Sequence, residues 1–520
     1  VVSDTYAPAN DAIVRVGDTV TYQLALDLQE GTTRNVAVQD VLPAGLAFVD
    51  IDSINGDNTA DYIPPASGAG SNFSYASITA AALPSAGATG SLGFTLGDVT
   101  NDPAGDATTD TLVIVYRARV VENVLSQTPS IVLSNTATLS YVDGTGLPVV
   151  DPARLQSVAS ITVQQPVMTA PTKTDRSGRT SPTNVNIATD VMNFQLESCN
   201  TTGLAPAYSI RLTDVLATQL DQASIAGPTN GAGQPDIIIN GTLATAGVDY
   251  IYTPPAARGG NMVLDLITAV NPGQCVTVNY DIGFHTDFGP NQSWNNSVTV
   301  DEYWSLPLQS GQLYTPLGPE IFTMTNVATI EPASKAMLIP ASGEATVGEV
   351  VLYEIMVPSV AANAALYDVV ISDTLHPSLE YISATEVSGT GLVVTNNTVA
   401  PGNVSLEIPL IPAGQQAVIE LRARVANNAS ADLGTSFGNT AGYTYAISDG
   451  GSVIVGGSAT TATSLTIVEP QLAINKNVVN LSNAGNPPLA GDILRYTLAL
   501  TAVGTGPGDN FTDAFDVRID

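Results

Sequence analysis

Lysine is scarce in this sequence, and its three copies occupy comparable places. Lys173, Lys335 and Lys476 each lie 14 to 17 residues ahead of the acidic residue of a recurring motif. If the surrounding segments are β-strands, their side chains alternate between two faces. Lys335 then shares a face with Met337, and Lys476 with Ile474, whereas Lys173 has fewer apolar neighbours. Amines are therefore predicted on the core side of first strands.

Two further polar residue types recur in the same inward phase. Three predicted strands carry an aspartate among inward apolar residues, and three later strands open with an asparagine in that phase. The aspartates are Asp40, Asp214 and Asp373, and the asparagines are Asn135, Asn296 and Asn439. The sequence thus predicts that a lysine, an aspartate and an asparagine meet inside one repeat.

Such a set has two chemical interpretations, because an isolated buried charge is costly and must be satisfied. One is a buried Lys–Asp ion pair bridged by the asparagine amide. The other is an intramolecular isopeptide bond, in which neutral lysine Nζ attacks the asparagine side-chain carbonyl, a protonated aspartate relays protons, and ammonia leaves. Desolvation shifts both pKa values in the required directions. A third alternative, exposed and unrelated residues, also stays open.

The elements that must position these residues repeat along the chain. Four segments share an acidic residue followed, four positions later, by an aromatic one, with a period of about 140 to 170 residues. They run from Asp18 to Tyr22, from Asp190 to Phe194, from Glu349 to Tyr353 and from Asp492 to Tyr496. Internal repetition at this period predicts tandem domains.

Alternation with period two, β-branched residues and turns such as Asn55-Gly56 predict strands throughout, and no amphipathic helix is evident. We therefore predict an all-β fold of tandem immunoglobulin-like β-sandwich domains in an extended rod, with prolines at the joints. The predicted domains are repeat 1 (1–166), repeat 2 (167–332), repeat 3 (333–470) and an incomplete first half of repeat 4 (471–520).

Repeats 1 and 4 depart from the pattern. Val1 to Asp4 occupy the expected lysine window of repeat 1 and contain no lysine. Three explanations stay open: the lysine lies upstream of Val1, this repeat never crosslinks, or another subunit supplies the strand. Repeat 4 stops one residue short of the expected aspartate. We expect the protein to continue beyond Asp520; the alternative is that strands from another chain complete this repeat.

These motifs resemble the bacterial and archaeal surface-protein repeat family called domain of unknown function 11. Its pattern is an early Lys, Gly-Asp-x-hydrophobic-x-Tyr, a strand ending in Asp-x-Leu-Pro, and a closing Asn-Thr-Ala. Repeat 3 matches most closely, through Lys335, Gly348-Glu349, Tyr353, Asp373-Thr374-Leu375 and Asn439-Thr440-Ala441. Repeat 2 departs most, with Ala188-Thr189-Asp190 in place of Gly-Asp. The resemblance implies immunoglobulin-like modules of secreted or wall-associated proteins, without enzymatic activity.

The Lys–Asp–Asn combination is also similar to that of sandwich modules in Gram-positive pilins and adhesins. In those modules a first-strand lysine and a last-strand asparagine are joined beside a buried acid. The resemblance implies isopeptide candidates at Lys173, Lys335 and Lys476 with the aspartates and asparagines named above.

Two weaker signals concern sulfur and metal. Cys199 and Cys275 lie in the same repeat and predict either a disulfide or two buried thiols. The oxygen-rich loop with Asp50, Asp52, Asp57 and Asp61 is a weak calcium candidate, against the alternative of a solvated acidic loop. Otherwise we expect no cofactor.

Composition limits the function classes. The formal net charge of −32 would repel nucleic acid and anionic membrane surfaces, and no apolar run is long enough to insert into a membrane. We expect an extracellular, non-enzymatic cell-surface structural protein (fibre, stalk or surface layer) whose partners are copies of itself or other surface proteins. The alternative is an adhesin that binds glycans or a host surface through its loops.

Overall fold

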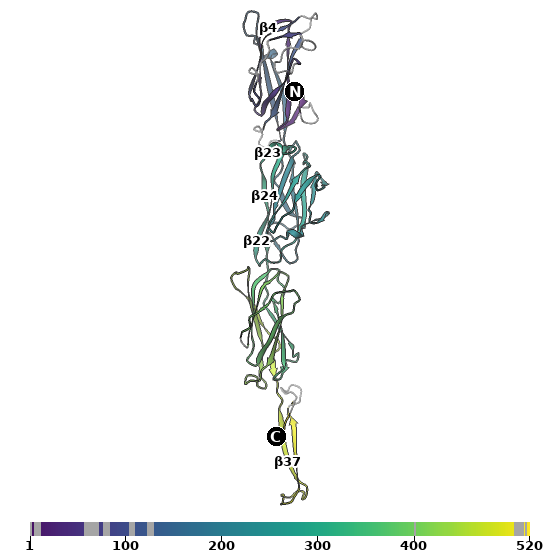
Figure 1. Cartoon of the computed structure of the whole chain (residues 1–520), viewed down its shortest axis with the longest axis vertical. Helices are drawn as coiled ribbons and strands as arrows, with labels where there is room; N and C mark the ends of the chain where they lie inside the picture. Colours follow the sequence, from purple (N-terminus) through teal and green to yellow (C-terminus); the bar gives the residue numbers. More distant parts are fainter. Residues whose placement is uncertain are drawn as a thin grey trace. The chain divides into compact units, whose positions relative to one another are not determined.

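The computed structural model describes residues 3–4, 12–56, 72–75, 84–102, 110–121, 129–399, 402–503, 514 and 517–520. Strands dominate these residues, and helical turns such as α1 (Pro152–Leu155) and η3 (Gln222–Ser224) are short (Figure 1). Residues 1–181, 192–282 and 295–322 form one compact unit, and residues 182–191, 283–294 and 323–520 form a second. Within the described residues, no helix has the length and apolar character needed to cross a bilayer.

Repeat 1 consists of two sheets. The first has the strand order β1-β3-β8-β5, and the second has the order β2-β10-β9-β4-β7-β6. The strands of the first are β1 (Ser3–Asp4), β3 (Thr19–Leu28), β8 (Asp110–Val120) and β5 (Leu46–Ile54). Those of the second are β2 (Ile13–Arg15), β10 (Gln156–Gln164), β9 (Ser130–Val142), β4 (Gly31–Val41), β7 (Ser91–Asn101) and β6 (Phe73–Ser74).

Repeat 2 again has two sheets. One has the order β11-β13-β21-β15-β16, with β17 and β18 attached through β21, and the other has the order β12-β24-β22-β14-β20-β19, with β23 on β22. The first contains β11 (Thr172–Asp175), β13 (Met192–Cys199), β21 (Cys275–Ile282), β15 (Ala226–Gly227), β16 (Gly231–Ala232), β17 (Asp236–Ile239) and β18 (Thr242–Leu243). The second contains β12 (Thr183–Val185), β24 (Leu317–Asn326), β22 (Gln292–Leu306), β14 (Tyr208–Val215), β20 (Asn261–Leu266), β19 (Tyr250–Thr253) and β23 (Ser310–Tyr314).

Repeat 3 has sheets of the orders β25-β27-β32-β29, β30-β31-β28-β34-β35 and β26-β36-β33. Their strands are β25 (Ser334–Ile339), β27 (Val350–Val357), β32 (Ala417–Val425), β29 (Leu379–Glu386), β30 (Thr395–Asn396), β31 (Asn403–Ile411), β28 (Leu366–Thr374), β34 (Thr440–Ala446), β35 (Ile454–Thr460), β26 (Glu344–Ala345), β36 (Leu465–Ile467) and β33 (Ser436–Phe437). Beyond them, β37 (Leu472–Asn480) and β38 (Leu494–Ala502) form a two-stranded sheet.

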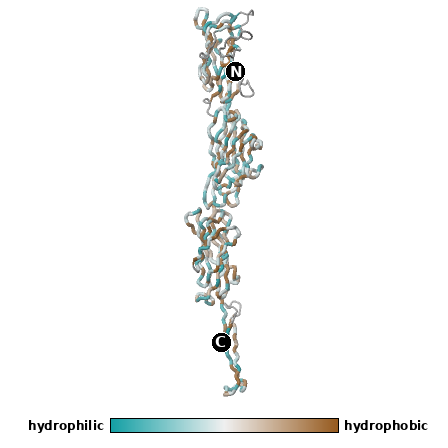
Figure 2. The backbone as a smooth tube through the Cα atoms, in the orientation of Figure 1, coloured by the Kyte–Doolittle hydropathy of each residue, from teal (hydrophilic) through white to brown (hydrophobic). Residues whose placement is uncertain are grey.

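Each core lies between two sheets, because alternate side chains of both point toward the interior. Apolar and polar residues alternate along the strands (Figure 2). In repeat 1, Phe94 on β7 packs on Tyr116 on β8, with ring centroids 5.7 Å apart. In repeat 2, Phe194 on β13 meets Phe322 on β24 edge to face. The predicted all-β class of tandem immunoglobulin-like sandwiches is confirmed.

The Gly–acid part of the repeated motif is a turn. Gly17, Gly348 and Gly491 have φ values of +99°, +92° and +96°, a region that favours glycine. The acid that follows accepts a hydrogen bond from a backbone N–H three residues earlier, such as Arg15 N to Asp18 Oδ2 at 2.8 Å. The same bond joins Thr346 N to Glu349 and Leu489 N to Asp492. This motif therefore fixes the start of the strand that follows it.

Candidate functional site

Repeat 2 brings its predicted lysine and aspartate together from two sheets. Lys173 on β11 donates to both carboxylate oxygens of Asp214 on β14, each at 2.6 Å. Asn296 on β22 lies on the strand next to β14, where Asp214 pairs with Val298. The exposed fractions of Lys173, Asp214 and Asn296 are 4%, 1% and 0%. Asp214 and Asn296 thus point inward as their strand phase predicted, and Lys173, whose phase was less clear, is buried with them.

A tyrosine completes this cluster, and the sequence pattern did not single it out. The Tyr280 hydroxyl on β21 donates to Asp214 Oδ2 at 2.5 Å, and it lies 3.2 Å from Lys173 Nζ and 3.1 Å from Asn296 Nδ2. Tyr116 holds the corresponding place in repeat 1. The two strands that carry these tyrosines correspond in the sequence, and this correspondence was the signal that could have identified them. In a strand of alternating apolar residues, such a tyrosine looks like ordinary core.

Repeat 3 pairs Lys335 on β25 with Asp373 on β28 through a buried ion pair. The side chains of both residues are fully buried, and Asn439, which directly precedes β34, is 2% exposed. Asp373 pairs with Ala441 on β34, so the asparagine lies at the start of the adjacent strand. Leu421 takes the place of the tyrosine, opposite Tyr353 on the first sheet.

Repeat 1 holds the aspartate and asparagine without a lysine among the described residues. The Tyr116 hydroxyl donates to Asp40 Oδ2 at 2.6 Å, and Asn135 Nδ2 lies 2.7 Å from that hydroxyl. Asp40 is fully buried and Asn135 is 3% exposed. Three buried oxygens here, Asp40 Oδ1, Asn135 Oδ1 and the Tyr22 hydroxyl, have no hydrogen-bond partner among the described residues.

Lys476 is exposed. Among the described residues its strand β37 pairs only with β38, which is the half of repeat 4 that this sequence contains. The inward orientation of Lys476 in a complete repeat stays a prediction.

The ring of the repeated aromatic residue contacts the lysine ammonium. Lys173 Nζ lies 4.7 Å from the ring centroid of Phe194, and Lys335 Nζ lies 4.6 Å from that of Tyr353. Lys476 Nζ lies 5.0 Å from the ring of Tyr496. An ammonium over a ring face gains about 2 kcal/mol when desolvated. The acid-to-aromatic motif thus supplies both a turn and a ring that contacts the lysine ammonium. The lysine itself pairs with the residue two positions after that ring.

Burial shifts the acid–base properties of the cluster. Desolvation lowers the pKa of Lys173 to about 8, although Asp214 opposes the shift. It also lowers the pKa of Lys335, against the opposing effect of Asp373. Burial raises the pKa of Asp373 and of Asp40, although their hydrogen-bond partners lower it in part. Both directions favour the neutral lysine and the protonated aspartate.

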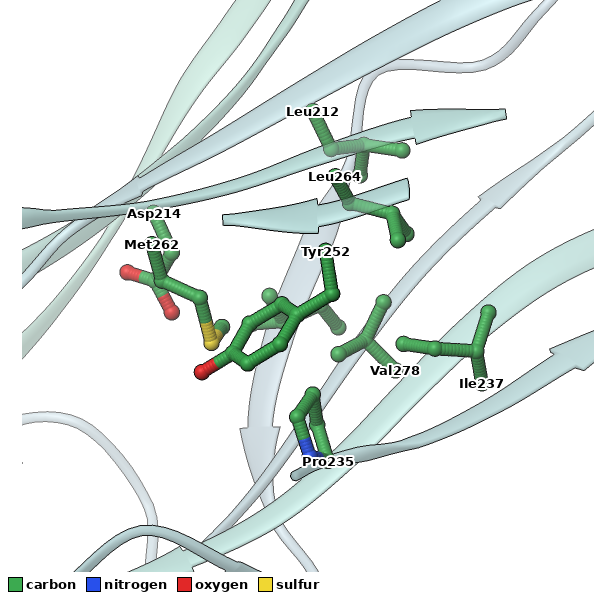
Figure 3. Close-up of a pocket in the computed structure, with 9 residues that line it drawn as sticks. Leu212, Asp214, Pro235, Ile237, Tyr252, Met262, Leu264 and Val278 are labelled. Atoms are coloured by element: carbon green, nitrogen blue, oxygen red, sulfur yellow. The ribbon is translucent and has the colours of Figure 1, made fainter. Parts of the chain in front are cut away.

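The space beside Asp214 is too small for a substrate. A cavity of about 10 Å³ lies there, lined by Asp214, Tyr252, Met262 and neighbouring apolar residues (Figure 3). Such a volume is close to the minimum that holds one water molecule. The buried cluster can therefore act on its own side chains, with an amine, an amide and a carboxyl group in one enclosed site.

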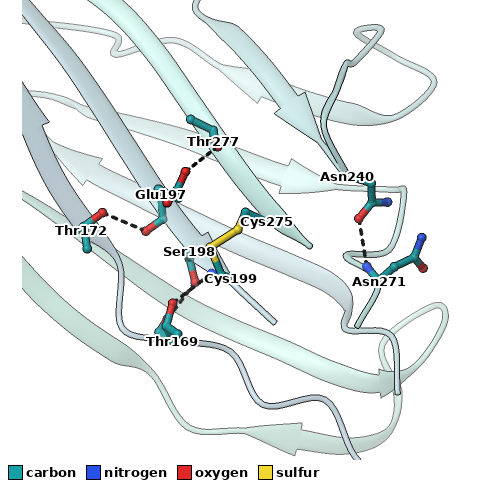
Figure 4. The surroundings of a disulfide bond; sticks show 9 residues. All are labelled: Thr169, Thr172, Glu197, Ser198, Cys199, Asn240, Asn271, Cys275 and Thr277. Atoms are coloured by element: carbon teal, nitrogen blue, oxygen red, sulfur yellow. Dashed lines mark hydrogen bonds between the residues drawn. A yellow bond between two sulfur atoms is a disulfide. The ribbon is translucent and has the colours of Figure 1, made fainter. Parts of the chain in front are cut away.

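Cys199 and Cys275 are joined by a disulfide between β13 and β21, where they are directly paired (Figure 4). The Thr169 carbonyl accepts a hydrogen bond from the Ser198 hydroxyl, and the Thr169 hydroxyl accepts one from Cys199 N at 2.9 Å. Glu197 lies near both sulfur atoms, with ligand atoms within 4.8 Å of one another. Because the sulfurs are bonded to each other, they offer no thiolate to a metal.

The calcium candidate is only partly described. Asp50 forms an ion pair with Arg117, whose Nε donates to Asp50 Oδ1 at 2.7 Å. Asp52 is exposed, and Asp57 and Asp61 lie outside the described residues. The calcium site stays a prediction.

Comparisons with known proteins give similarities of fold. No family model matches the chain, and no curated protein matches it. The major pilin SpaD of Corynebacterium diphtheriae is 11% identical, with 85% of this chain and 91% of that chain covered and a TM-score of 0.23.

A 35 kDa C-terminal fragment of the major pilin GBS80 of Streptococcus agalactiae is 10% identical. The match covers 55% of this chain and 90% of that chain, with a TM-score of 0.24. The collagen adhesin CNA of S. aureus is 9% identical. The match covers 64% of this chain and 95% of that chain, with a TM-score of 0.16. At these values we draw no conclusion about function from the three structures. The resemblance to domain of unknown function 11 stays a prediction.

Proposed function

We propose that this chain is a structural part of an extracellular surface protein, a fibre, stalk or surface layer, whose repeats 2 and 3 are each closed by a Lys–Asn isopeptide bond. The observation that carries the proposal is the sealed cluster of Lys173, Asp214, Tyr280 and Asn296. The disulfide supports an oxidising, extracellular setting. The same chemistry in repeat 3 uses Lys335, Asp373 and Asn439. We propose the four repeat boundaries given above as the domain boundaries.

The proposed reaction needs no cofactor. Neutral lysine Nζ attacks asparagine Cγ, the new C–N bond forms, and the Cγ–Nδ2 bond breaks with release of ammonia. The protonated aspartate donates its proton to the amide oxygen and, as a carboxylate, takes one proton from lysine Nζ. It passes this proton to the leaving Nδ2 and recovers the first proton when the carbonyl re-forms, so that atoms and charge balance. In repeat 2, the Tyr280 hydroxyl touches the aspartate, the lysine and the asparagine, and it holds the three groups in one geometry.

Such bonds suit a structural protein. Each would link the first strand of a repeat to one of its last strands and so close a loop that contains most of the repeat. A covalently closed repeat cannot extend fully under tension.

Intact mass of the reduced, denatured chain tests the proposal. Each bond removes one ammonia, so we expect a deficit of about 17 Da per closed repeat and about 34 Da in total. Lys335→Ala and Asn439→Ala should each leave about half of this deficit, because repeat 2 still closes. Lys476→Ala, the matched lysine control, should keep all of it.

An unmodified mass would reject the crosslink. Lys173 and Lys335 would then be partners in buried ion pairs, and the adhesin alternative would gain weight.

A further inference from the structure

The proposed reaction must deliver a proton to the nitrogen that leaves the asparagine. An unprotonated amide ion is too strong a base to leave carbon, so the Cγ–Nδ2 bond breaks only when Nδ2 receives a proton. The aspartate is the source, since it has taken a proton from lysine Nζ. A group that contacts both the aspartate and Nδ2 can therefore carry this proton.

In repeat 2 the Tyr280 hydroxyl contacts both groups. It lies 2.5 Å from Asp214 Oδ2 and 3.1 Å from Asn296 Nδ2. Lys173 Nζ, from which the proton comes, lies 3.2 Å from the same hydroxyl. Tyr280 and Asn296 are both fully buried. One hydroxyl oxygen thus joins the attacking amine, the carboxyl group and the leaving nitrogen.

The Tyr280 hydroxyl is held in its neutral form. Burial, reinforced by the charge of Asp214, raises the pKa of Tyr280 well above its usual value. Such a hydroxyl can pass a proton only by accepting one on its oxygen while it donates its own. This transfer needs a proton donor on one side and an acceptor on the other, and Asp214 and Asn296 Nδ2 occupy those two sides.

The three repeats differ at this strand position, which in each of them pairs with the aromatic residue of the repeated motif. In repeat 1 the Tyr116 hydroxyl lies 2.6 Å from Asp40 Oδ2 and 2.7 Å from Asn135 Nδ2, as in repeat 2. In repeat 3 the position is Leu421, opposite Tyr353, so it supplies no hydroxyl. The chain thus contains one proposed reaction with a tyrosine at this position and one without.

We infer that Tyr280 is a catalytic residue of repeat 2, whose hydroxyl passes a proton from Asp214 to the leaving Nδ2 of Asn296. This inference rests on the proposed function. Once the Nζ–Cγ bond has formed, the carboxyl proton moves to the tyrosine oxygen while the hydroxyl proton moves to Nδ2. The Cγ–Nδ2 bond then breaks, ammonia leaves, and the tyrosine is unchanged.

The rate of bond formation, measured separately for repeats 2 and 3 of the whole chain, tests the inference. Cell-free synthesis under oxidising conditions is stopped with denaturant at increasing times, and peptide mapping quantifies each joint. Tyr280→Phe keeps the ring and removes only the hydroxyl. We expect it to slow closure of repeat 2 about 100-fold and to leave repeat 3 unchanged. Tyr303→Phe, which removes another buried tyrosine hydroxyl of repeat 2 further along β22, should change neither rate.

Mixtures of H₂O and D₂O distinguish a proton carrier from a residue that only positions the asparagine. A relay moves two protons in one step, so the closure rate of wild-type repeat 2 should fall along a curve as the deuterium fraction rises. Repeat 3, with Leu421, should show a straight line, and so should repeat 2 of Tyr280→Phe. The wild-type measurement does not require that the variant folds.

Two results would overturn the inference: equal closure rates of repeat 2 in wild type and Tyr280→Phe, or a straight-line dependence on deuterium in wild-type repeat 2. The mass deficit of about 34 Da in the wild type is read separately. If that deficit is present with either of these results, the inference fails and the proposed function stands. If the deficit is absent, the proposed function fails and the inference fails with it.

Discussion

A lysine in a protein interior is a nucleophile only if it is neutral, and the environment of Lys173 favours that form. Burial lowers its pKa to about 8, so that about a tenth of the amine is uncharged at pH 7, far more than for an exposed lysine. Asp214 touches the amine with both oxygens and also accepts from Tyr280. The carboxyl group is thus positioned to exchange protons with the amine.

Removing this carboxyl group should stop the reaction in repeat 2. We expect Asp214→Asn to slow bond formation at least 100-fold, because general acid–base catalysis contributes about 10²- to 10⁴-fold. Intact mass should then show about half of the wild-type deficit. Asp281→Asn is the matched control, since Asp281 is a partly exposed partner of Arg176. An undiminished deficit in Asp214→Asn would contradict the assigned role.

Asp40 predicts a pH dependence of stability in repeat 1. Burial raises its pKa in the folded state above the unfolded value. Its contribution to the free energy of unfolding is therefore fully present below about pH 4 and is lost as the pH rises through the folded-state pKa. We expect Asp40→Asn to stabilise repeat 1 at pH 7 and to have little effect near pH 3.

Calorimetry of the whole chain between pH 3 and pH 8 checks this. One unfolding transition should fall in temperature as the pH rises in the wild type and stay level in Asp40→Asn. Parallel pH profiles in the two proteins would show that Asp40 is not the group responsible.

At the scale of elements, the strands and their faces could be predicted because alternation with period two is direct evidence of a half-buried strand. The same alternation predicted that Asp40, Asp214 and Asp373 lie on the buried faces of their strands. Tyr116 and Tyr280 could not be assigned to the site, since a tyrosine in an alternating strand is equally consistent with core packing.

Other features depend on contacts that are distant in sequence. The short parallel strands, such as β12 on β24 and β26 on β36, have no local pattern that distinguishes them from loops. The edges of β13 and β27 that β11 and β25 cover likewise follow from tertiary arrangement.

The disulfide gives a prediction at this scale, because it joins two adjacent strands that are far apart in sequence. Cys199 and Cys275 are separated by 76 residues. In the chain-entropy model, a loop of this length stabilises the fold by about 4 kcal/mol. We expect Cys199→Ser/Cys275→Ser to lower the unfolding temperature of repeat 2, measured by calorimetry.

The control for this prediction is the wild-type chain under reducing conditions, which should show the same loss. The mass deficit should not change in the double variant, since neither cysteine touches the lysine. A double variant as stable as the oxidised wild type would contradict the predicted contribution.

For the whole molecule, the proposed bonds determine how much chain can be drawn out by force. Lys335 and Asn439 are separated by 104 residue positions. A bond between them would keep this segment from extending when the chain is pulled from its ends.

Single-molecule force spectroscopy of the whole chain should therefore distinguish wild type from Lys335→Ala. At about 3.4 Å per residue, the variant should gain about 350 Å of contour length in the unfolding event of repeat 3. Lys476→Ala should leave this event unchanged, because Lys476 lies outside the loop. Equal contour lengths in wild type and Lys335→Ala would mean that repeat 3 is not covalently closed.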